Sequence, residues 1–200
     1  YMVKSGLVDR PDVSHYRLAA HLTTAFVTFA FTLWVALDLI FPIKQTINKT
    51  YRDLIRIGLA ILFIQIIYGA FVAGLDAGFI HNNWPMMNEG KFMHETVLIE
   101  KTPLYKNFIE GRSGVQFVHR ILAFIVVFSV LIIYINGKKI AVSNYQLYGL
   151  NSLLILVGVQ SLLGVLAILL QVPLWLGIAH QIGAFLLLSS MIFTLHRFSK

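Results

Sequence analysis

Histidines inside apolar runs are the residues of this sequence best suited to chemistry. The phrase A-H-x-x-x-A-F occurs twice, around His21 (residues 20–26) and around His180 (residues 179–185), each time about one turn into a long apolar run. His119 stands at the same depth in a third run. A histidine within a membrane span is costly and indicates a functional site by default, and imidazole is the commonest metal ligand among side chains. Three histidines at one depth therefore predict a layer of metal ligands.

The composition indicates an integral membrane protein. Of 200 residues, 58% are hydrophobic and 12% charged, and the mean hydropathy is +0.76, whereas soluble domains are about half apolar and a quarter charged. The sequence has no cysteine, which excludes disulfides, thiolate ligands and iron–sulfur clusters. The formal net charge of +7 comes from Lys and Arg between the apolar runs. These residues read as topology signals, and we expect no nucleic-acid partner.

Five apolar stretches are long enough to cross a bilayer, which takes about 20 residues as helix. We therefore predict an all-α membrane protein whose last four spans form an up-down-up-down bundle. In such a bundle the helices of His119 and His180 are parallel and diagonal, roughly 11–14 Å apart, which suits two imidazoles facing each other through one iron atom. The span of His21 then lies outside the bundle. The predicted spans are Arg17–Phe41, Leu54–Leu75, Val115–Ile135, Tyr148–Gln171 and Trp175–Leu195.

The charges of the short loops predict the orientation of the spans. Residues 43–53 carry three bases against one acid, and Lys138 and Lys139 follow the third span without an acid, whereas residues 77–114 mix four bases with four acids. The positive-inside rule places the N-terminus and the 77–114 loop outside and the C-terminus inside. The apolar content of this long loop favours a lid lying over the histidine layer.

Other polar residues near these spans have open interpretations. Arg17, one turn before His21, and Arg120, next to His119, can snorkel to lipid headgroups or pair with carboxylates of an acidic cofactor. A zinc or copper site would need all three histidines to converge, which the placement of His21 outside the bundle disfavours. The remaining histidines are interpreted as solvated or interfacial; they are His15, His81, His94 and His196.

Ordered blocks along the whole chain resemble heme A synthase of the mitochondrial and Gram-negative bacterial type. The blocks are YMVKSGL (1–7), HYRLAAHL (15–22), GAFVAGLDAG (69–78), NNWPMM (82–87), QFVHR (116–120), QSLLGVLAILLQVP (160–173) and AHQ (179–181). The resemblance implies an oxidoreductase of eight spans, built as two similar four-helix halves. It oxidises one ring methyl of heme O to a formyl group, which gives heme A for cytochrome oxidase assembly.

The resemblance also implies that this chain is the C-terminal part, spans four to eight. Residues 1–16 would be the end of a preceding span with an outer loop. Residues 17–52 would be the last helix of the N-terminal half with an inner loop, and residues 53–200 the C-terminal half, whose four-helix bundle surrounds a heme. The repeated phrase would then mark the last helix of each half. Most catalytic residues would lie in the missing spans, so we expect the chain alone to be inactive.

The family's ligands map onto the three histidines. The resemblance implies that His119 and His180 are axial ligands of a heme b and that His21 ligates the substrate heme O. Arg17 and Arg120 would then contact heme propionates. The implied surroundings are the lipid bilayer of a bacterial or mitochondrial inner membrane and an electron donor that the sequence does not identify. The resemblance leaves open an association with heme O synthase and a homo-oligomer.

Two functions from other classes share some of these features. A b-type cytochrome subunit that passes electrons to or from quinone would have the same bis-histidine bundle, but would not need the repeat to reach a second half. A proton-coupled transporter would use the buried histidines without heme, and would spread its polar residues through the depth of the bundle. In this sequence the histidines concentrate at one depth.

Overall fold

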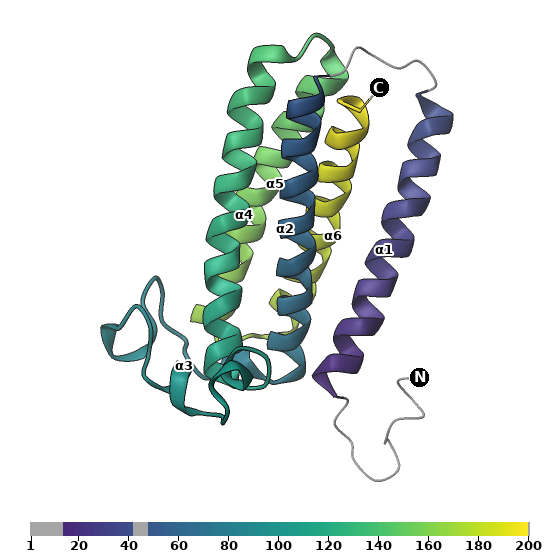
Figure 1. Ribbon diagram of the computed structural model, residues 1–200. Coiled ribbons are helices and arrows are strands. Elements are labelled where there is room, and N and C mark those ends of the chain that lie inside the picture. Colours follow the sequence, from purple (N-terminus) through teal and green to yellow (C-terminus); the bar gives the residue numbers. More distant parts are fainter. Residues whose placement is uncertain (1–13, 42–47, 200) are drawn as a thin grey trace.

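The computed structural model describes residues 14–41 and 48–199, and its described part is helical without strands. All five long helices are long and apolar enough to cross a membrane, which agrees with a multi-pass membrane protein. Each predicted span coincides with one of them apart from a few terminal residues. The helices are α1 (His15–Ile40), α2 (Lys49–Gly74), α4 (Arg112–Ile140), α5 (Asn144–Leu169) and α6 (Leu174–Arg197) (Figure 1).

Polar caps explain why α2 and α5 begin before their apolar runs. The side chain of Asn48 accepts the backbone N–H of Tyr51 at 3.0 Å and so satisfies one of the first N–H groups of α2. Ser143 and Gln146 form a capping box at the start of α5. Helix α4 ends with two basic residues. Lys138 and Lys139 lie in its last turn, where the helix dipole favours positive charge.

The predicted four-helix bundle is confirmed. Helix α4 packs against α2 and α5, and α6 packs against the same two helices, whereas α4 and α6 make no close backbone contact with each other. They are therefore diagonal. Helices α1, α4 and α6 all begin at one end of the molecule, which we call the histidine end (bottom of Figure 1). Helix α1 packs on α2 and α6 from outside the bundle.

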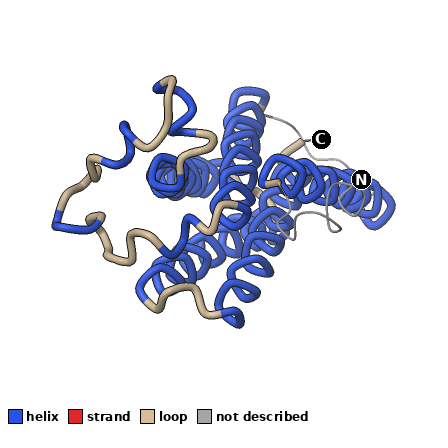
Figure 2. Tube along the Cα trace, turned by 90° about the horizontal axis from the view of Figure 1, so that it is seen from below, coloured by secondary structure: helices blue, strands red, loops and turns tan. Residues whose placement is uncertain are grey.

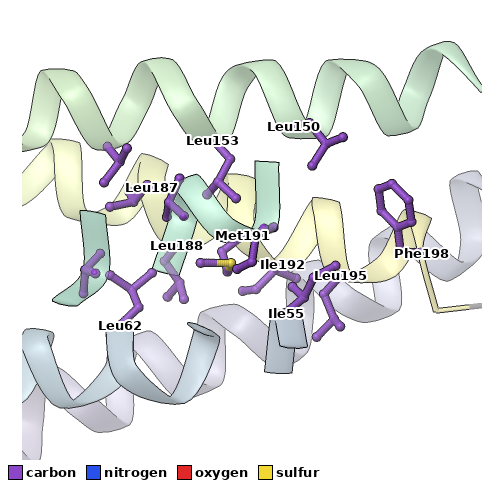
Figure 3. Close-up of a cluster of buried hydrophobic side chains, with 14 of the residues drawn as sticks. Ile55, Leu62, Leu150, Leu153, Leu187, Leu188, Met191, Ile192, Leu195 and Phe198 are labelled. Atoms are coloured by element: carbon purple, nitrogen blue, oxygen red, sulfur yellow. The ribbon is translucent and has the colours of Figure 1, made fainter. Parts of the chain in front are cut away.

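An apolar core fills the bundle away from the histidine end (Figure 3). Leu187, Leu188 and Met191 of α6 stand at its centre, each at most 1% exposed. Without a hydrophobic driving force between helices in lipid, such close packing is what holds the spans together. The core stops at one level on each helix, before the histidine end is reached. Its last members toward that end are Ile66, Val126, Val157 and Leu187.

The connection between α2 and α4 begins across the end of the bundle and then leaves it. It contains η2 (Ala77–Phe79), η3 (Asn88–Gly90), α3 (Thr96–Ile99) and η4 (Leu104–Phe108). Only η2 contacts several long helices, namely α2, α4 and α5, whereas α3 and η4 pack on α4. Figures 1 and 2 show the rest of the loop projecting sideways past α4.

This arrangement corrects the prediction of a lid over the histidine layer, which holds only for the start of the loop. The later part folds around itself because buried Asn107 donates to the carbonyls of Leu98, Lys101 and Leu104 at 2.9–3.0 Å. These bonds satisfy the loop's own backbone locally.

Helix α1 is tied to α6 far from the histidine end. Nε2 of His196 lies 3.1 Å from Oδ1 of Asp38, and the Trp34 ring meets the same imidazole edge-on. His196 is only 8% exposed, so it is not solvated, and its place in the last turn of α6 leaves the interfacial interpretation a prediction. The block at residues 1–7, residue 200, most of the segment proposed for 1–16 and the inner loop at 42–47 lie outside the described residues.

Candidate functional site

The structure brings His119 and His180 together and leaves His21 apart. His119 stands seven residues into α4 after Arg112, and His180 six residues into α6 after Leu174. Both side chains are partly buried, and both helices pack against α2 and α5. His21 stands at the same depth in α1, but its side chain is exposed and lies outside the bundle. Counted from the first residue of its helix, each of the three histidines therefore lies six or seven residues in, and two of the three belong to the bundle.

Each of the two bundle histidines faces a glutamine of a neighbouring helix. Nε2 of Gln65 on α2 lies 3.4 Å from Nε2 of His119. Nε2 of Gln160 on α5 lies 3.3 Å from Nε2 of His180 and also donates to the His180 backbone carbonyl at 3.0 Å. The same type of contact thus occurs twice, once on each side of the bundle.

A glycine lies one turn after each glutamine, next to the imidazole, and the fit is tight at Gly164 and ordinary at Gly69. A Cβ atom added at Gly69 would lie 3.4 Å from Cε1 of His119, and one added at Gly164 would lie 3.0 Å from Cε1 of His180. The phrase Q-x-x-x-G at residues 65–69 and 160–164 is thus a shared element of the site. We did not single it out from the sequence, although its repetition and its position two helices apart were visible there.

Several polar atoms of these four side chains are buried without a partner. They are Nδ1 of His119, Nδ1 of His180, Oε1 of Gln65 and Oε1 of Gln160. Leaving a buried donor or acceptor unpaired costs about 1–3 kcal/mol, and clusters of such atoms in a native site call for an explanation. The set is the same in both histidine–glutamine pairs.

Arg120 holds the start of the α2–α4 connection against the bundle. Its guanidinium donates to the backbone carbonyls of His81 (2.6 Å), Asn83 (3.0 Å) and Met86 (3.3 Å). The residue is 5% exposed, and its Nε–H has no partner. This loop-holding role was not predicted, because hydrogen bonds to carbonyls distant in sequence leave no local pattern.

Arg17 does not share this environment. It lies on α1, four residues before His21, and is partly buried. Arg17 and Arg120, the two predicted propionate contacts, therefore both lie at the histidine end. Arg120 belongs to the four-helix bundle, whereas Arg17 belongs to α1, outside the bundle.

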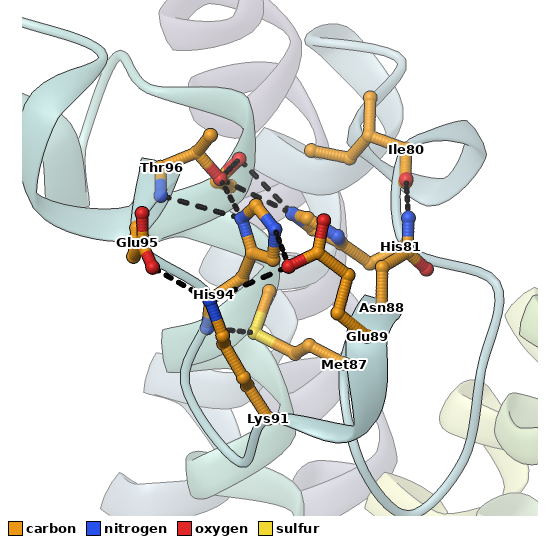
Figure 4. A network of polar contacts seen from close by, with 10 residues as sticks. Ile80, His81, Met87, Asn88, Glu89, Lys91, His94, Glu95 and Thr96 are labelled. Atoms are coloured by element: carbon orange, nitrogen blue, oxygen red, sulfur yellow. Dashed lines mark hydrogen bonds and ion pairs between the residues drawn. The ribbon is translucent and has the colours of Figure 1, made fainter.

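A second polar network lies under the connection, beside α4 (Figure 4). His81 is 4% exposed, and its Nε2 lies 3.1 Å from Oγ of Ser113, which also accepts a hydrogen bond from Oγ1 of Thr96. Burial, with His94 and Arg120 nearby, lowers the pKa of His81 to about 4, while Glu100 acts in the opposite direction. His81 is therefore a neutral, structural histidine and is not solvated, while its place at the membrane interface stays a prediction.

The outer edge of this network is an exposed ion pair. Nζ of Lys91 lies 2.6 Å from Oε1 of Glu95. This hydrogen bond raises the pKa of Lys91 and lowers the pKa of Glu95. Because both groups face solvent, the pair adds little stability.

Comparison of the sequence with known proteins shows to which family the chain belongs. Residues 1–192 match the COX15-CtaA family, described as "Cytochrome oxidase assembly protein". The chain belongs to this family. It is 56% identical over 200 residues to the heme A synthase of Flavobacterium psychrophilum and 57% identical over 202 residues to that of Flavobacterium johnsoniae. Both comparisons cover 100% of this chain and 59% of the relative.

More distant members of the COX15-CtaA family include a mitochondrial-type relative. The heme A synthase COX15 of Bos taurus is 38% identical over 201 residues, which cover 94% of this chain and 48% of the relative. The chain thus spans about 59% of the length of its two Flavobacterium relatives.

Proposed function

We propose that this chain is the heme-binding C-terminal part of a heme A synthase. The enzyme would be an oxidoreductase that oxidises a ring methyl of heme O to a formyl group. The observation that carries the proposal is the pair His119 and His180, set at one depth on the diagonal helices of a bundle that belongs to the COX15-CtaA family. That family membership does not favour a b-type cytochrome subunit or a proton-coupled transporter.

The residues at the histidine end fit a heme. The packed core ends before this level, and Gly164 stands where a Cβ would press on the His180 imidazole. Two partly buried imidazoles from opposite helices are suitable axial ligands for low-spin iron. When bound, heme b would supply one-electron chemistry at its iron. His119 and His180 would hold the iron from its two faces, and the apolar core would keep water out of the bundle from the other end.

Charged groups at this end support a cofactor with acidic substituents. We propose that Arg120 contacts a propionate through the Nε–H that has no partner in the structure, while its other nitrogens hold the loop. An unpaired cationic donor in a buried place favours an anion. Arg17, on α1, is proposed as the propionate contact for the heme at His21.

His21 is proposed to ligate heme O at a separate site. Its exposed position on the outer face of α1 supports this role, because a ligand there needs a partner from outside the four-helix bundle. We propose that residues 17–52 belong to the other half of the enzyme. We also propose that the 200 residues alone hold at most one heme and form no heme A.

The proposed setting is the inner membrane of a bacterium or a mitochondrion, with the histidine end outside. The loop charges support this orientation. Heme O would be the substrate, and an electron donor of unknown identity would act on the protein. A homo-oligomer and an association with heme O synthase remain part of this proposal.

Alanine substitutions in the full-length protein test these roles. His119→Ala and His180→Ala should each abolish the low-spin heme b absorption spectrum, while His94→Ala, a loop variant, should retain it. His21→Ala should keep that spectrum but stop heme A formation, measured by extraction and chromatography of hemes. An unchanged spectrum in both bundle variants would refute the heme b site, and normal heme A yield from His21→Ala would refute the substrate site.

A further inference from the structure

The start of the α2–α4 connection lies along the side of α4, within the apolar run of that helix. The indole of Trp84 stacks on the ring of Phe124, with centroids 5.4 Å apart and planes at 21°. The ring of Phe92 meets that of Phe117 edge-on at 5.9 Å. Figure 1 shows the projecting loop beside the lower part of α4. Residues 83–93 therefore lie next to a part of the helix that is expected to be within the membrane.

The contact of Trp84 reaches well past the level at which the apolar run begins. Phe124 stands nine residues after Val115, the first residue of the predicted span, and nine residues of helix rise about 14 Å. Helical side chains lean back by about one turn toward the start of their helix, so the indole lies about 8 Å inside the span. Because the hydrocarbon layer is about 30 Å thick, Trp84 lies in the half of this layer nearer the histidine end.

The face of α4 that carries these rings is turned toward lipid. Phe128 and Ile135 follow Phe124 on the same face, at spacings of four and seven residues. Their side chains are 61% and 55% exposed, so this face is not covered by α2 or α5, the long helices that pack on α4. At the start of α4 it is residues 83–93 that cover it. They therefore stand between α4 and the surrounding lipid.

Arg120 makes irregular backbone tolerable at this depth. Non-helical backbone within a membrane must have its polar groups satisfied by the protein, because lipid offers no hydrogen bonds. Arg120 stands on the same face of α4, and its guanidinium donates to the carbonyls of His81, Asn83 and Met86. The segment covers the cation, which is 5% exposed, and an uncovered arginine facing lipid would be costly. Each partner thus removes the cost of placing the other beside lipid.

The outward side chains of the segment are apolar. Met86 and Phe92 are 42% and 57% exposed. The charged residues beside Phe92 contact each other, with Nζ of Lys91 2.6 Å from Oε1 of Glu95. An apolar surface next to a solvated ion pair is the pattern of a segment that lies at the boundary between lipid and water.

We propose that residues 83–93 form a re-entrant membrane segment at the histidine end, with Met86 and Phe92 in contact with lipid acyl chains. Lipid is the partner, because the exposed side chains continue the lipid-facing surface of α4. The connection is then held at the membrane by these contacts as well as by Arg120. The contact needs no bound heme and holds for either orientation of the spans, so it goes beyond the proposed function and does not depend on it.

Fluorescent labels on single cysteines test the lipid contact. The 200 residues contain no cysteine, so Met86→Cys and Phe92→Cys in an otherwise cysteine-free full-length protein each carry one bimane label. The protein is placed in nanodiscs of phosphatidylcholine with or without bromine on the acyl chains. We expect the brominated lipid to quench most of the fluorescence at both positions, and aqueous iodide to quench little of it.

The exposed Lys101 of the same connection provides the control. The label on Lys101→Cys should show the opposite pattern, with quenching by iodide and little by brominated lipid. Iodide quenching of all three labels would place the segment in water and overturn the proposal. Protection of residues 86 and 92 from both quenchers would assign their surface to a second protein molecule, and this result too would refute the lipid contact.

Discussion

Replacing Gly164 by alanine should weaken the site, whereas the same change at Gly158 of the same helix should not. A Cβ atom at residue 164 would lie 3.0 Å from Cε1 and 3.6 Å from Nδ1 of His180. A Cβ atom at residue 158 would meet no described atom within 4 Å. Both glycines lie inside α5, so the two variants differ mainly in what the new methyl group touches.

The expected magnitudes follow from two opposing effects. Alanine in place of glycine within a helix stabilises by roughly 0.5–1 kcal/mol, and Gly158→Ala should gain this in full. At Gly164 the same gain is opposed by overpacking against the imidazole, which costs about 1–3 kcal/mol. The variants should therefore differ by about 2 kcal/mol, or about 4–8 °C in melting temperature for a chain of this size.

Thermal unfolding in detergent, followed by far-UV circular dichroism, measures this difference, and the absorption spectrum of the proposed heme b tests the effect on His180. Gly164→Ala should melt below the parent and broaden or lose the low-spin bands, and Gly158→Ala should melt slightly above it. Gly69→Ala, whose Cβ would lie 3.4 Å from Cε1 of His119, should fall between them. Equal stabilisation by all three, with unchanged spectra, would show that neither imidazole lies against a glycine.

Three further predictions concern the histidine end. A protease site inserted in residues 77–114 should be cut only from outside the cell, and one in residues 136–144 only from inside; the reverse pattern would invert the topology. His81, with a native pKa of about 4 and an ordinary value near 6.5, stays neutral when folded but protonates when the loop opens. The free energy needed to open the loop around His81 should therefore fall by about 3 kcal/mol as the pH drops from about 6.5 to about 4. Hydrogen exchange in the loop measures this loss, which should be largely absent in His81→Gln. Arg120→Met should remove the three bonds to loop carbonyls and speed proteolysis between residues 81 and 93 at least tenfold, and an unchanged cleavage rate would refute its loop-holding role.

Hydropathy predicts the five long helices, and the positions of the histidines along them predict that His119 and His180 belong to one site. Both predictions depend only on where residues lie along each span. Predicting the bundle and the diagonal placement of His119 and His180 required only the number of helices and the shortness of the turns between them. Helix starts were placed too far inside, as at Lys49, because polar capping residues extend a helix beyond its apolar run. These features are local, so the sequence reveals them.

The contacts that complete the site are not local. Gln65 contacts a ring 54 positions away and Arg120 a carbonyl 39 positions away. The repeated Q-x-x-x-G phrase marks the glutamines in the sequence, but it does not show which side chain each of them contacts. The burial of His81 likewise depends on how an irregular loop lies on α4. From the sequence alone, such residues look like ordinary polar side chains at an interface.

Because α6 carries both a histidine of the candidate site and the centre of the apolar core, it has a consequence for biogenesis. This last helix supplies His180 together with the central residues of the apolar core, Leu187, Leu188 and Met191. While the ribosome is still translating α5, the nascent protein therefore has neither a sealed interior nor a second imidazole. A chain that ends before α6 lacks both the centre of the apolar core and one of the two proposed heme ligands, so it can complete neither the bundle nor the proposed site.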